Sequence, residues 1–359
     1  MKVLKSAERF GKNILIRLVK IFIKQESFNL SDLDISKVDR IIIVHLDRKV
    51  GNLILTTPLL EATKKVFQNA TVDILISSPV KVLIESNPFL THVFEFNHSR
   101  FIRNPFRLFS LITSIRKNNY LVAIESSNPS GTSFLNGCIT NLTKAKYRIG
   151  FSGGSGSLFT NIHITPNKAD HYLLSKQKLV QVFTNQIFSL KPKIFVDKRD
   201  VENVKQNLVS RFNIEKSKKI IGIWIGARDN KKWDIENFYS IYQQIIKETS
   251  YFSILMFGIE EIKQFDKIDK TKFNALSFTD LNVLKNFISS CNIFISCDTG
   301  PLHYAYALDV NTIGIFLQDN FKTYGYNAEG KNYIIKPDET TKMIEEVLRV
   351  IKLIEEKPI

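Results

Sequence analysis

The chain has 359 residues, 44% hydrophobic and 24% charged, a globular composition long enough for two domains of ordinary size. Lys and Arg (50) outnumber Asp and Glu (35), which gives a formal net charge of +15. This charge suits an anionic partner: nucleic acid, an anionic membrane surface or a phosphorylated substrate. The three cysteines (Cys138, Cys291, Cys297) form no CxxC pair, so neither a disulfide framework nor a zinc site is indicated, and the cytoplasm is the expected compartment.

Residues 1–24 (MKVLKSAERFGKNILIRLVKIFIK) lack the unbroken apolar run of about 18 residues that a membrane span needs. They predict a basic amphipathic helix, with seven Lys and Arg against one acid, Glu8. Two interpretations stay open. The helix lies in the interface of an anionic leaflet, which would attach the protein peripherally to the inner face of the cytoplasmic membrane, or it packs on the body of the protein or on a second copy.

A polar stretch follows, and it contains a DxD sequence, Asp32-Leu33-Asp34. Metal-dependent sugar transferases use such a pair, but here it precedes the first expected strand, so we interpret it as a solvated turn. No metal site is predicted.

From residue 40 onward, strand-like and helix-like segments alternate through two successive halves of the chain. In the first half, strands are expected at 40–46, 71–77, 93–96 and 120–126, and helices at 52–67, 79–87, 103–118 and 170–183. In the second half, strands are expected at 219–226, 252–258, 292–297 and 312–317, and helices at 235–247, 259–265, 280–290, 301–308 and 340–356. This alternation predicts an α/β protein with two parallel-sheet domains. The expected divisions are 1–36 (basic helix and linker), 37–190, 191–335 and a C-terminal helix, 336–359.

Several common motifs are missing from the sequence. The glycine-rich stretch 150–157 satisfies neither GxGxxG nor GxxxxGK[ST], so a flexible surface loop is expected there and no cofactor is predicted. There is no GxSxG or HExxH, and the six histidines show no metal-ligand spacing. No nucleic-acid-binding motif accompanies the positive charge, so nucleic acid is not an expected partner.

The stretch FISCDTGPLHYAYAL, residues 294–308, places Asp298, Thr299 and Gly300 where a buried strand gives way to a helix. In an open α/β sheet this edge binds ligands, and the N–H groups of a helix N-terminus hold phosphates there. Taken alone, the same residues also fit a helix cap with a turn glycine.

Three stretches together carry a family resemblance: HLDRKVGNLILTTPLLEATKKVFQNATVDILIS, GIWIGARDNKKWDIENFYSIYQQI and CDTGPLHYAYAL. Over residues 39–335, their order resembles the heptosyltransferases, glycosyltransferase family nine. The resemblance implies a GT-B fold, in which two Rossmann-like domains face a central cleft, with the donor on the C-terminal domain and the acceptor on the N-terminal one. It implies an inverting, metal-independent transfer, with an ADP-sugar, first of all ADP-heptose, as donor and an anionic lipopolysaccharide-type glycolipid or other cell-envelope glycan as acceptor.

The resemblance also implies site residues. Lys231 matches the family lysine that meets the donor phosphate, and Lys232 is an alternative. The acid that reads the nucleoside is Glu260 or Glu261. Asp298 matches the acid at the donor sugar, and His303 either contacts the ligand or packs beneath the loop. The implied donor site comprises Lys231, Lys232, Glu260, Glu261, Asp298, Thr299, Gly300 and His303.

On the acceptor side, Gly51, Arg103 and Arg107 are the candidates, although the arginines equally fit a solvated helix face. The family usually has Gly-Asp after the first strand, and that aspartate is its proposed general base. Here the pair is Gly51-Asn52, so Asp47 at the end of the same strand is the nearest carboxylate that could serve. The family loop resembling FGPTDP reads FLQDNFKTYGYN here, so the donor sugar or base could differ.

Three functions remain open. The first is an inverting glycosyltransferase of the cell envelope. The second is a weak or inactive family member that binds nucleotide-sugar or glycan as an accessory protein, which Asn52 favours. The third is a membrane-associated scaffold or nucleic-acid binder. Trp233 and Phe238 are expected to be packing residues rather than sugar platforms.

Overall fold

The computed structural model describes residues 28, 30, 33–129, 131–328 and 330–356, and it divides into two compact units. The first unit contains the described residues up to Arg48, together with Pro58–Lys81 and Pro88–Leu190. The second contains Lys49–Thr57, Val82–Asn87 and the described residues from Lys191 onward. Two short segments from the first half of the chain therefore belong to the second unit. The basic helix expected at residues 1–24 lies outside the described residues.

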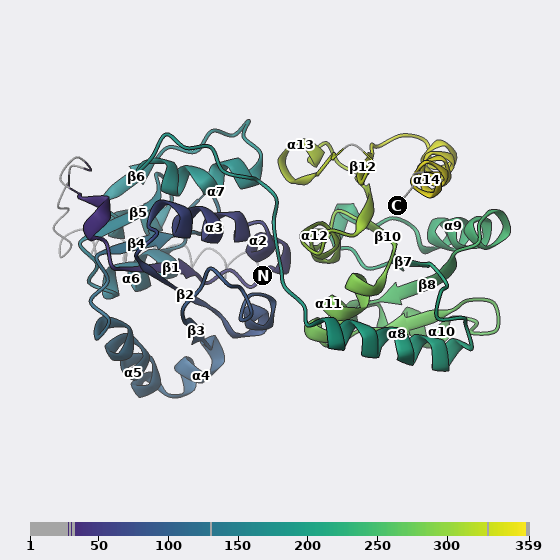
Figure 1. The fold of residues 1–359 in the computed structure, drawn as a ribbon, viewed down its shortest axis with the longest axis horizontal. Helices are drawn as coiled ribbons and strands as arrows, with labels where there is room; N and C mark the ends of the chain where they lie inside the picture. Colours follow the sequence, from purple (N-terminus) through teal and green to yellow (C-terminus); the bar gives the residue numbers. More distant parts are fainter. Residues whose placement is uncertain (1–27, 29, 31–32, 130, 329, 357–359) are drawn as a thin grey trace, which may run out of the picture. The chain divides into compact units, whose positions relative to one another are not determined.

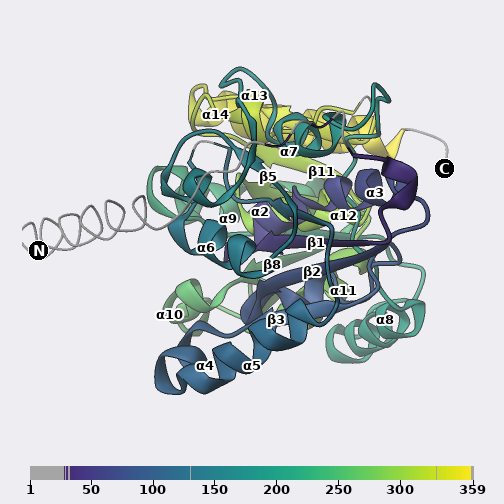
Figure 2. The same cartoon turned by 90° about the vertical axis from the view of Figure 1, so that its left-hand side faces the viewer.

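The first unit is built on a parallel sheet of six strands in the order β3-β2-β1-β4-β5-β6 (Figures 1 and 2). The central strand β1 reads RIIIVH, and its five residues Ile41 to His45 are buried, as expected for a β-branched strand covered on both faces. The strands are β1 (Arg40–His45), β2 (Thr71–Ser77), β3 (Val93–Phe96), β4 (Val122–Glu125), β5 (Tyr147–Phe151) and β6 (Ile162–Ile164).

Helices follow most of these strands, as in a doubly wound domain. Ile112 and Ile115 of α5 and Ile139 of α6 share a core cluster with Ile42 and Val44 of β1, so these two helices cover the same face of the sheet. The helices that begin in or belong to this unit are α3 (Thr57–Val66), α4 (His98–Arg103), α5 (Pro105–Arg116), α6 (Phe134–Leu142) and α7 (Tyr172–Gln181).

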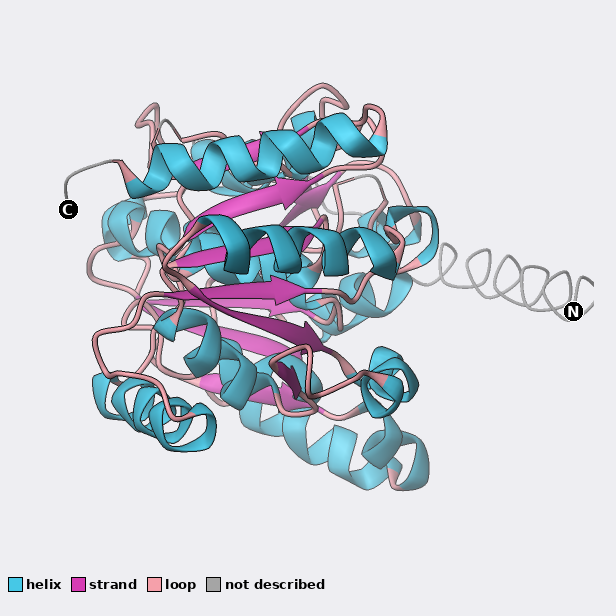
Figure 3. Ribbon diagram, turned by 90° about the vertical axis from the view of Figure 1, so that its right-hand side faces the viewer, coloured by secondary structure: helices cyan, strands magenta, loops and turns pink. Residues whose placement is uncertain are grey.

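The second unit repeats the plan with the strand order β12-β11-β10-β7-β8-β9. Figure 3 shows helices lying over its strands, and a core cluster joins α9 and α14 to the sheet. Its strands are β7 (Ile220–Trp224), β8 (Phe252–Phe257), β9 (Ala275–Ser277), β10 (Ile293–Cys297), β11 (Asn311–Ile315) and β12 (Asn332–Ile335). Its helices are α2 (Val50–Ile54), α8 (Lys198–Phe212), α9 (Ile235–Glu248), α10 (Ile262–Lys267), α11 (Leu281–Ser290), α12 (Gly300–Ala307), α13 (Phe321–Tyr324) and α14 (Thr340–Glu355).

The predicted alternation of strands and helices is confirmed, with local differences. The single helix expected at 52–67 is two helices, α2 and α3, and residues 79–87 contain a 3₁₀ segment, Ser78–Leu83, in place of an α-helix. The glycine-rich stretch at 150–157 is not a free loop, because β5 and the 3₁₀ helix Ser155–Phe159 occupy most of it. Gly156 packs so closely on α6 that a Cβ there would lie 2.3 Å from the Ser133 carbonyl oxygen.

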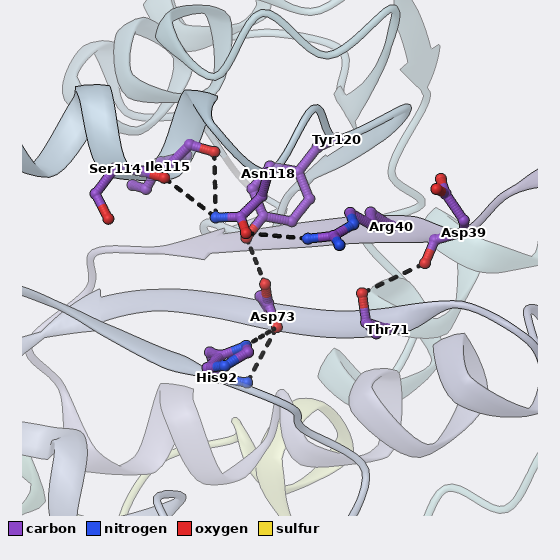
Figure 4. A network of polar contacts seen from close by, with 9 residues as sticks. All are labelled: Asp39, Arg40, Thr71, Asp73, His92, Ser114, Ile115, Asn118 and Tyr120. Carbon is purple, nitrogen blue, oxygen red and sulfur yellow. Dashed lines mark hydrogen bonds and ion pairs between the residues drawn. The ribbon is translucent and has the colours of Figure 1, made fainter.

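A polar network ties the amino-terminal ends of the first sheet's strands together (Figure 4). The buried carboxylate of Asp73 in β2 accepts hydrogen bonds from the Tyr120 hydroxyl, just before β4, and from the His92 backbone N–H, just before β3, at 3.0 Å. Arg40 donates to the Asn118 side chain at 3.1 Å. These contacts lie at the edge opposite the carboxyl ends of the strands, so we assign them to the stability of the sheet.

Candidate active site

In each sheet the strand order reverses at one point, and at that point the loops at the carboxyl ends separate to leave room for a ligand. In the second unit the reversal lies between β7 and β10, because β8 and β9 continue on one side and β11 and β12 on the other. The segment after β10 is Asp298-Thr299-Gly300, and the segment after β7 leads to Lys231. The sequence-predicted donor residues therefore come from both sides of one switch point.

Asp298 is the centre of this site. Its carboxylate is almost fully buried, and its Oδ2 accepts hydrogen bonds from Lys231 Nζ and from Asn320 Nδ2, each at 2.5 Å. His303 Nε2 lies 3.8 Å from the other oxygen, Oδ1. The structure thus brings Lys231, which lies 67 residues before Asp298 in the sequence, to the same carboxylate as His303 of α12.

Lys231 reaches the carboxylate from a tight turn. The turn passes through Asp229, whose φ of 54° lies in the left-handed region, and ends in the 3₁₀ helix Asp229–Lys231. Trp233, two residues after Lys231, is buried and packs edge-on against Phe238 of α9. The prediction that these two aromatic residues serve packing is confirmed, and their burial anchors the end of the lysine turn.

Helix α12 begins at this site, with Thr299 as its N-cap residue. The Thr299 hydroxyl lies 2.9 Å from the Ser296 hydroxyl, and Pro301, which has no backbone N–H, occupies the first turn. The helix N-terminus is an anion-binding element in general, because its first N–H groups have no partners within the helix.

The first turn of α12 is also the contact surface for α2, whose residues 50–54 belong to the same unit. A Cβ at Gly51 would lie 2.7 Å from His303 Cδ2, and a Cβ at Gly300 would lie 3.2 Å from the Val50 Cβ. Both glycines permit the close approach of the two helices. Gly51 is therefore positioned against His303.

The two candidate nucleoside acids have different environments. Glu260 is half-exposed and forms an ion pair with Arg228, whose Nε lies 3.0 Å from Oε1, and this pair lowers the pKa of Glu260. Glu261 is buried beside Gly226, Gly258 and Trp224, and burial raises its pKa. Lys232 opposes that rise through its positive charge. Both acids lie directly after β8, which is the neighbour of β7.

The comparison with known proteins identifies the family. A model described as glycosyltransferase family 9 (heptosyltransferase) matches residues 108–347, more than half of the chain. The chain belongs to glycosyltransferase family 9. A curated relative, lipooligosaccharide heptosyltransferase 2 of Campylobacter jejuni, is 27% identical over 288 residues, which cover 77% of this chain and 81% of the relative. This chain is therefore a glycosyltransferase.

Solved structures agree on the fold. The family 9 glycosyltransferase of Veillonella parvula superposes with a TM-score of 0.76 at 17% identity and covers 90% of this chain and 99% of its own. The heptosyltransferase WaaC of E. coli, solved with ADP-2-deoxy-2-fluoro heptose, gives 0.63 at 17% identity, with 87% and 99% covered. With two six-stranded parallel sheets, the family 9 chain has the GT-B fold.

The switch point of the first unit, between β1 and β4, holds a buried cluster of ionisable side chains that the sequence did not predict. His45 ends β1, Glu125 ends β4, and Lys176 comes from α7; all three side chains are inaccessible to solvent. Lys176 Nζ donates to the carbonyl oxygens of Ser126 and Ser127, and His45 Nδ1 lies 2.9 Å from the Ser126 carbonyl oxygen.

Burial sets the protonation of this cluster. It lowers the pKa of Lys176 to about 7, and together with the positive charge of Lys176 it lowers the pKa of His45 to about 4. Burial raises the pKa of Glu125. Asp47, two residues after β1 and half-buried, acts on both His45 and Lys176 through its negative charge, so the acid predicted from the sequence belongs to this cluster electrostatically.

Arg103 and Arg107 lie elsewhere in the first unit. They follow β3, the outermost strand on that side, so β2 and β3 separate them from β1. Both side chains are exposed. The structure does not bring them to Asp47.

Among the residues that the sequence did not predict, Asn320 left a signal, whereas Lys176 and Arg228 did not. Asn320 follows the expected strand at 312–317, and because parallel strands end at the same edge, a polar residue after that strand was a candidate neighbour of Asp298. Lys176 lies in the middle of an ordinary amphipathic pattern, and Arg228 in a charged turn, so neither stood out.

Proposed function

We propose that this family 9 glycosyltransferase transfers heptose from ADP-heptose to a lipooligosaccharide-type acceptor. The observation that carries the proposal is the Lys231–Asp298 pair at the start of α12, at the switch point of the second sheet. The names of its relatives support the choice of substrates: the Campylobacter relative is a lipooligosaccharide heptosyltransferase, and the E. coli structure contains an ADP-heptose analogue.

The donor end of the site fits a nucleotide-sugar. When the sugar is transferred, the pyrophosphate leaves with negative charge, which Lys231 and the first N–H groups of α12 are suited to stabilise. Donor binding would share the lysine between the phosphate and Asp298, and the Asp298 oxygens would then accept hydrogen bonds from sugar hydroxyls. We assign the nucleoside hydroxyls to Glu261, because Glu260 is already paired with Arg228.

The acceptor end needs a base. The acceptor hydroxyl loses its proton as its oxygen bonds to the anomeric carbon, the bond from that carbon to the ADP oxygen breaks, and the configuration inverts. Asn52 cannot accept this proton. We therefore propose Asp47 as the acceptor of the proton, with the buried Lys176 as the cationic group that interacts with it electrostatically.

Peripheral membrane attachment belongs to the same proposal, since a lipid-anchored acceptor is reached at a bilayer surface. No helix in the part of the chain that the structure describes is long and apolar enough to cross a bilayer. The alternative of an inactive accessory protein gains no support from the comparisons.

A donor screen with the full chain tests the proposal. ADP-heptose, GDP-mannose and UDP-glucose are supplied with lipooligosaccharide truncated before the heptose region, and nucleotide release and product mass are measured with and without a chelator. We expect transfer from ADP-heptose alone, unchanged by the chelator. In the same assay Asp47→Asn should lower kcat at least about 100-fold with donor binding retained. Faster transfer from another donor, or full activity in Asp47→Asn, would contradict the assignment of donor or base.

A further inference from the structure

The surface of α4 and α5 carries three large apolar side chains that are exposed to solvent. Ile102 is 83% exposed, Phe106 84% and Phe109 70%. Every residue from Ile102 to Arg107 is exposed, including the junction Asn104-Pro105 between the two helices. Isolated exposed apolar residues are common, but three large ones on two consecutive helices are typical of an interaction surface. The helices lie next to each other beyond β3 (Figures 1 and 2).

Packing on the inner side holds these residues outward. In α4, Phe101 packs edge-on against Phe96 of β3, with ring centroids 4.8 Å apart, which leaves its neighbour Ile102 facing away. In α5, Ile112 and Ile115 are buried in the core. Phe106 precedes the buried Ile115 by nine residues, or two and a half turns, so it lies on the opposite side of that helix, and Phe109 lies between the two sides and is 70% exposed. Their exposure is a consequence of the helical register.

Charge surrounds this apolar surface. Arg100, Arg103 and Arg107 are all exposed, and none is in an ion pair with another described residue. No Asp or Glu occurs from residue 96 to residue 124, while five Lys and Arg occur there. The surface is therefore apolar at its centre, positive around it and without a compensating acid in its own sequence.

This combination selects the occupant. An apolar protein partner would leave the arginines uncompensated, whereas an anionic leaflet supplies acyl chains for the phenylalanines and phosphates for the guanidinium groups at adjacent depths. Arginine side chains are long enough to reach the headgroups while the aromatic rings lie below them. We propose that α4 and α5, through Ile102, Phe106, Phe109 and the three arginines, dock the protein on an anionic bilayer.

The proposed docking surface deepens the proposed function, and its role in presenting the acceptor rests on that function. Helix α4 follows the carboxyl end of β3, so the surface lies at the same edge of the first sheet as Asp47. Docking there would bring a lipid-anchored acceptor to that edge. It also gives Arg103 and Arg107 headgroup phosphates as ligands, in place of the acceptor contacts expected from the sequence.

A tryptophan placed on the surface reports insertion directly. The native Trp224 and Trp233 are 7% and 6% exposed, so they form a constant buried background. In full-length Phe106→Trp, vesicles of phosphatidylcholine with about 30% phosphatidylglycerol should shift the added emission to the blue, and brominated acyl chains should quench it. Ile187→Trp, at a position 92% exposed outside these helices, is the matched control and should do neither. If the Phe106→Trp protein binds vesicles while the emission of the introduced indole stays unchanged, the proposal is overturned, as it is if the protein does not bind at all.

Loss variants measure the contribution of each part. Phe106→Ser with Phe109→Ser should weaken vesicle partition at least tenfold, while Ile187→Ser leaves it unchanged. Arg100→Gln should weaken it about fivefold at low salt, the ratio that corresponds to about 1 kcal/mol per charge near an anionic surface. The same proteins are assayed for transfer to a detergent-solubilised acceptor. Quenching without transfer would refute the proposed function but support the docking surface. Transfer without quenching would support the proposed function but refute the docking surface. Capture of a protein by this surface in place of lipid would also overturn the proposal.

Discussion

Two lysines of this chain illustrate how residue environment decides chemistry. Lys231 has a partly exposed side chain and forms an ion pair with Asp298, and we propose that it meets the donor phosphate. Lys176 has no exposure, and its ammonium group is surrounded by backbone carbonyl oxygens. Burial lowers the pKa of Lys176 to about 7, because the charged form loses its hydration in this environment.

At Lys231, the charge is expected to act on the donor. Lys231→Met should weaken ADP binding at least tenfold, because a charge-assisted contact to phosphate is lost and the pairing of Asp298 is disturbed. Isothermal titration with ADP measures the change. Lys232→Met is the matched control, because Lys232 is exposed and is not the partner of Asp298. Equal losses in both variants would point to general electrostatic attraction, and no loss in Lys231→Met would remove this residue from the donor site.

At His45, a pH-dependent stability is expected. The pKa of the folded protein's His45, about 4, lies below the value of about 6.5 that an unfolded chain has. Between those values the unfolded state binds more protons, so the free energy of unfolding falls as pH falls from 6.5 to 4. The contribution is about 3 kcal/mol, at about 1.4 kcal/mol per pKa unit.

Urea unfolding of the wild type and His45→Gln at pH 7, 5.5 and 4 tests this effect. The variant should lose less stability across that range. Glu125, whose raised pKa acts in the opposite direction, is present in both proteins, so it cancels in the comparison. Identical pH slopes would show that His45 is not the titrating group.

At the scale of elements, the sequence was most informative where a strand is long and apolar. β1, β2, β7, β8 and β10 all lie within one or two residues of their predicted positions, because buried parallel strands need continuous β-branched runs. Helix α8, whose only buried residue is Leu208, and the short strands β6 and β9 were not predicted from the sequence, because such elements carry little periodic signal.

The residues of the candidate site likewise differ in how far the sequence predicts their positions. Residues that follow strong strands, such as Asp298, could be placed at a sheet edge from sequence. The contacts between Asp298 and Asn320, and between α2 and α12, could not, since they depend on which strands and helices become neighbours in space. The same holds for Lys176, whose burial results from the packing of α7 and not from its local sequence.

The close contact between α2 and α12 predicts that a methyl group added at Gly51 lowers the stability of the protein. Gly51→Ala places a Cβ 2.7 Å from the ring of His303, which is buried and has little room to move. We expect a loss of about 1–3 kcal/mol of stability, as for other overpacked sites. Gly131→Ala, where a Cβ would meet no atom within 4 Å, is the control.

The double variant Gly51→Ala/His303→Ala isolates the clash. Its loss should be smaller than the sum of the two single losses, because the ring that obstructs the methyl group is gone. Additive losses, measured by urea unfolding, would mean that the glycine is required for another reason, such as backbone conformation.

At the scale of the whole molecule, the boundary between units does not follow the sequence. Residues 49–57 belong to the second unit, while Pro58–Lys81 belong to the first, and a single helix, α3, begins at the boundary between them. A ligand at the start of α12 should therefore stabilise a segment that lies about 250 residues away along the chain.

Hydrogen exchange with and without ADP tests this connection. Bound ligand at 100 times its dissociation constant adds about 2.7 kcal/mol to the state that binds it. Peptides from residues 49–57 should gain protection together with α12, while peptides from β2 should not. Protection of β2 equal to that of 49–57 would mean that the ligand stabilises both units, and no change at 49–57 would place the ligand away from α2.

The assignment of residues 49–57 to the second unit also has a consequence for biosynthesis. Leu53, Ile54 and Leu55 are fully buried in the finished protein, yet α12, against which their helix packs, leaves the ribosome much later. At roughly 5–20 residues per second, the intervening chain of about 250 residues takes on the order of 10–50 s to synthesise. During that interval the growing polypeptide carries an apolar turn whose partner does not yet exist. The first unit can form its sheet within that time, but the second unit is completed only by a segment made at the very beginning.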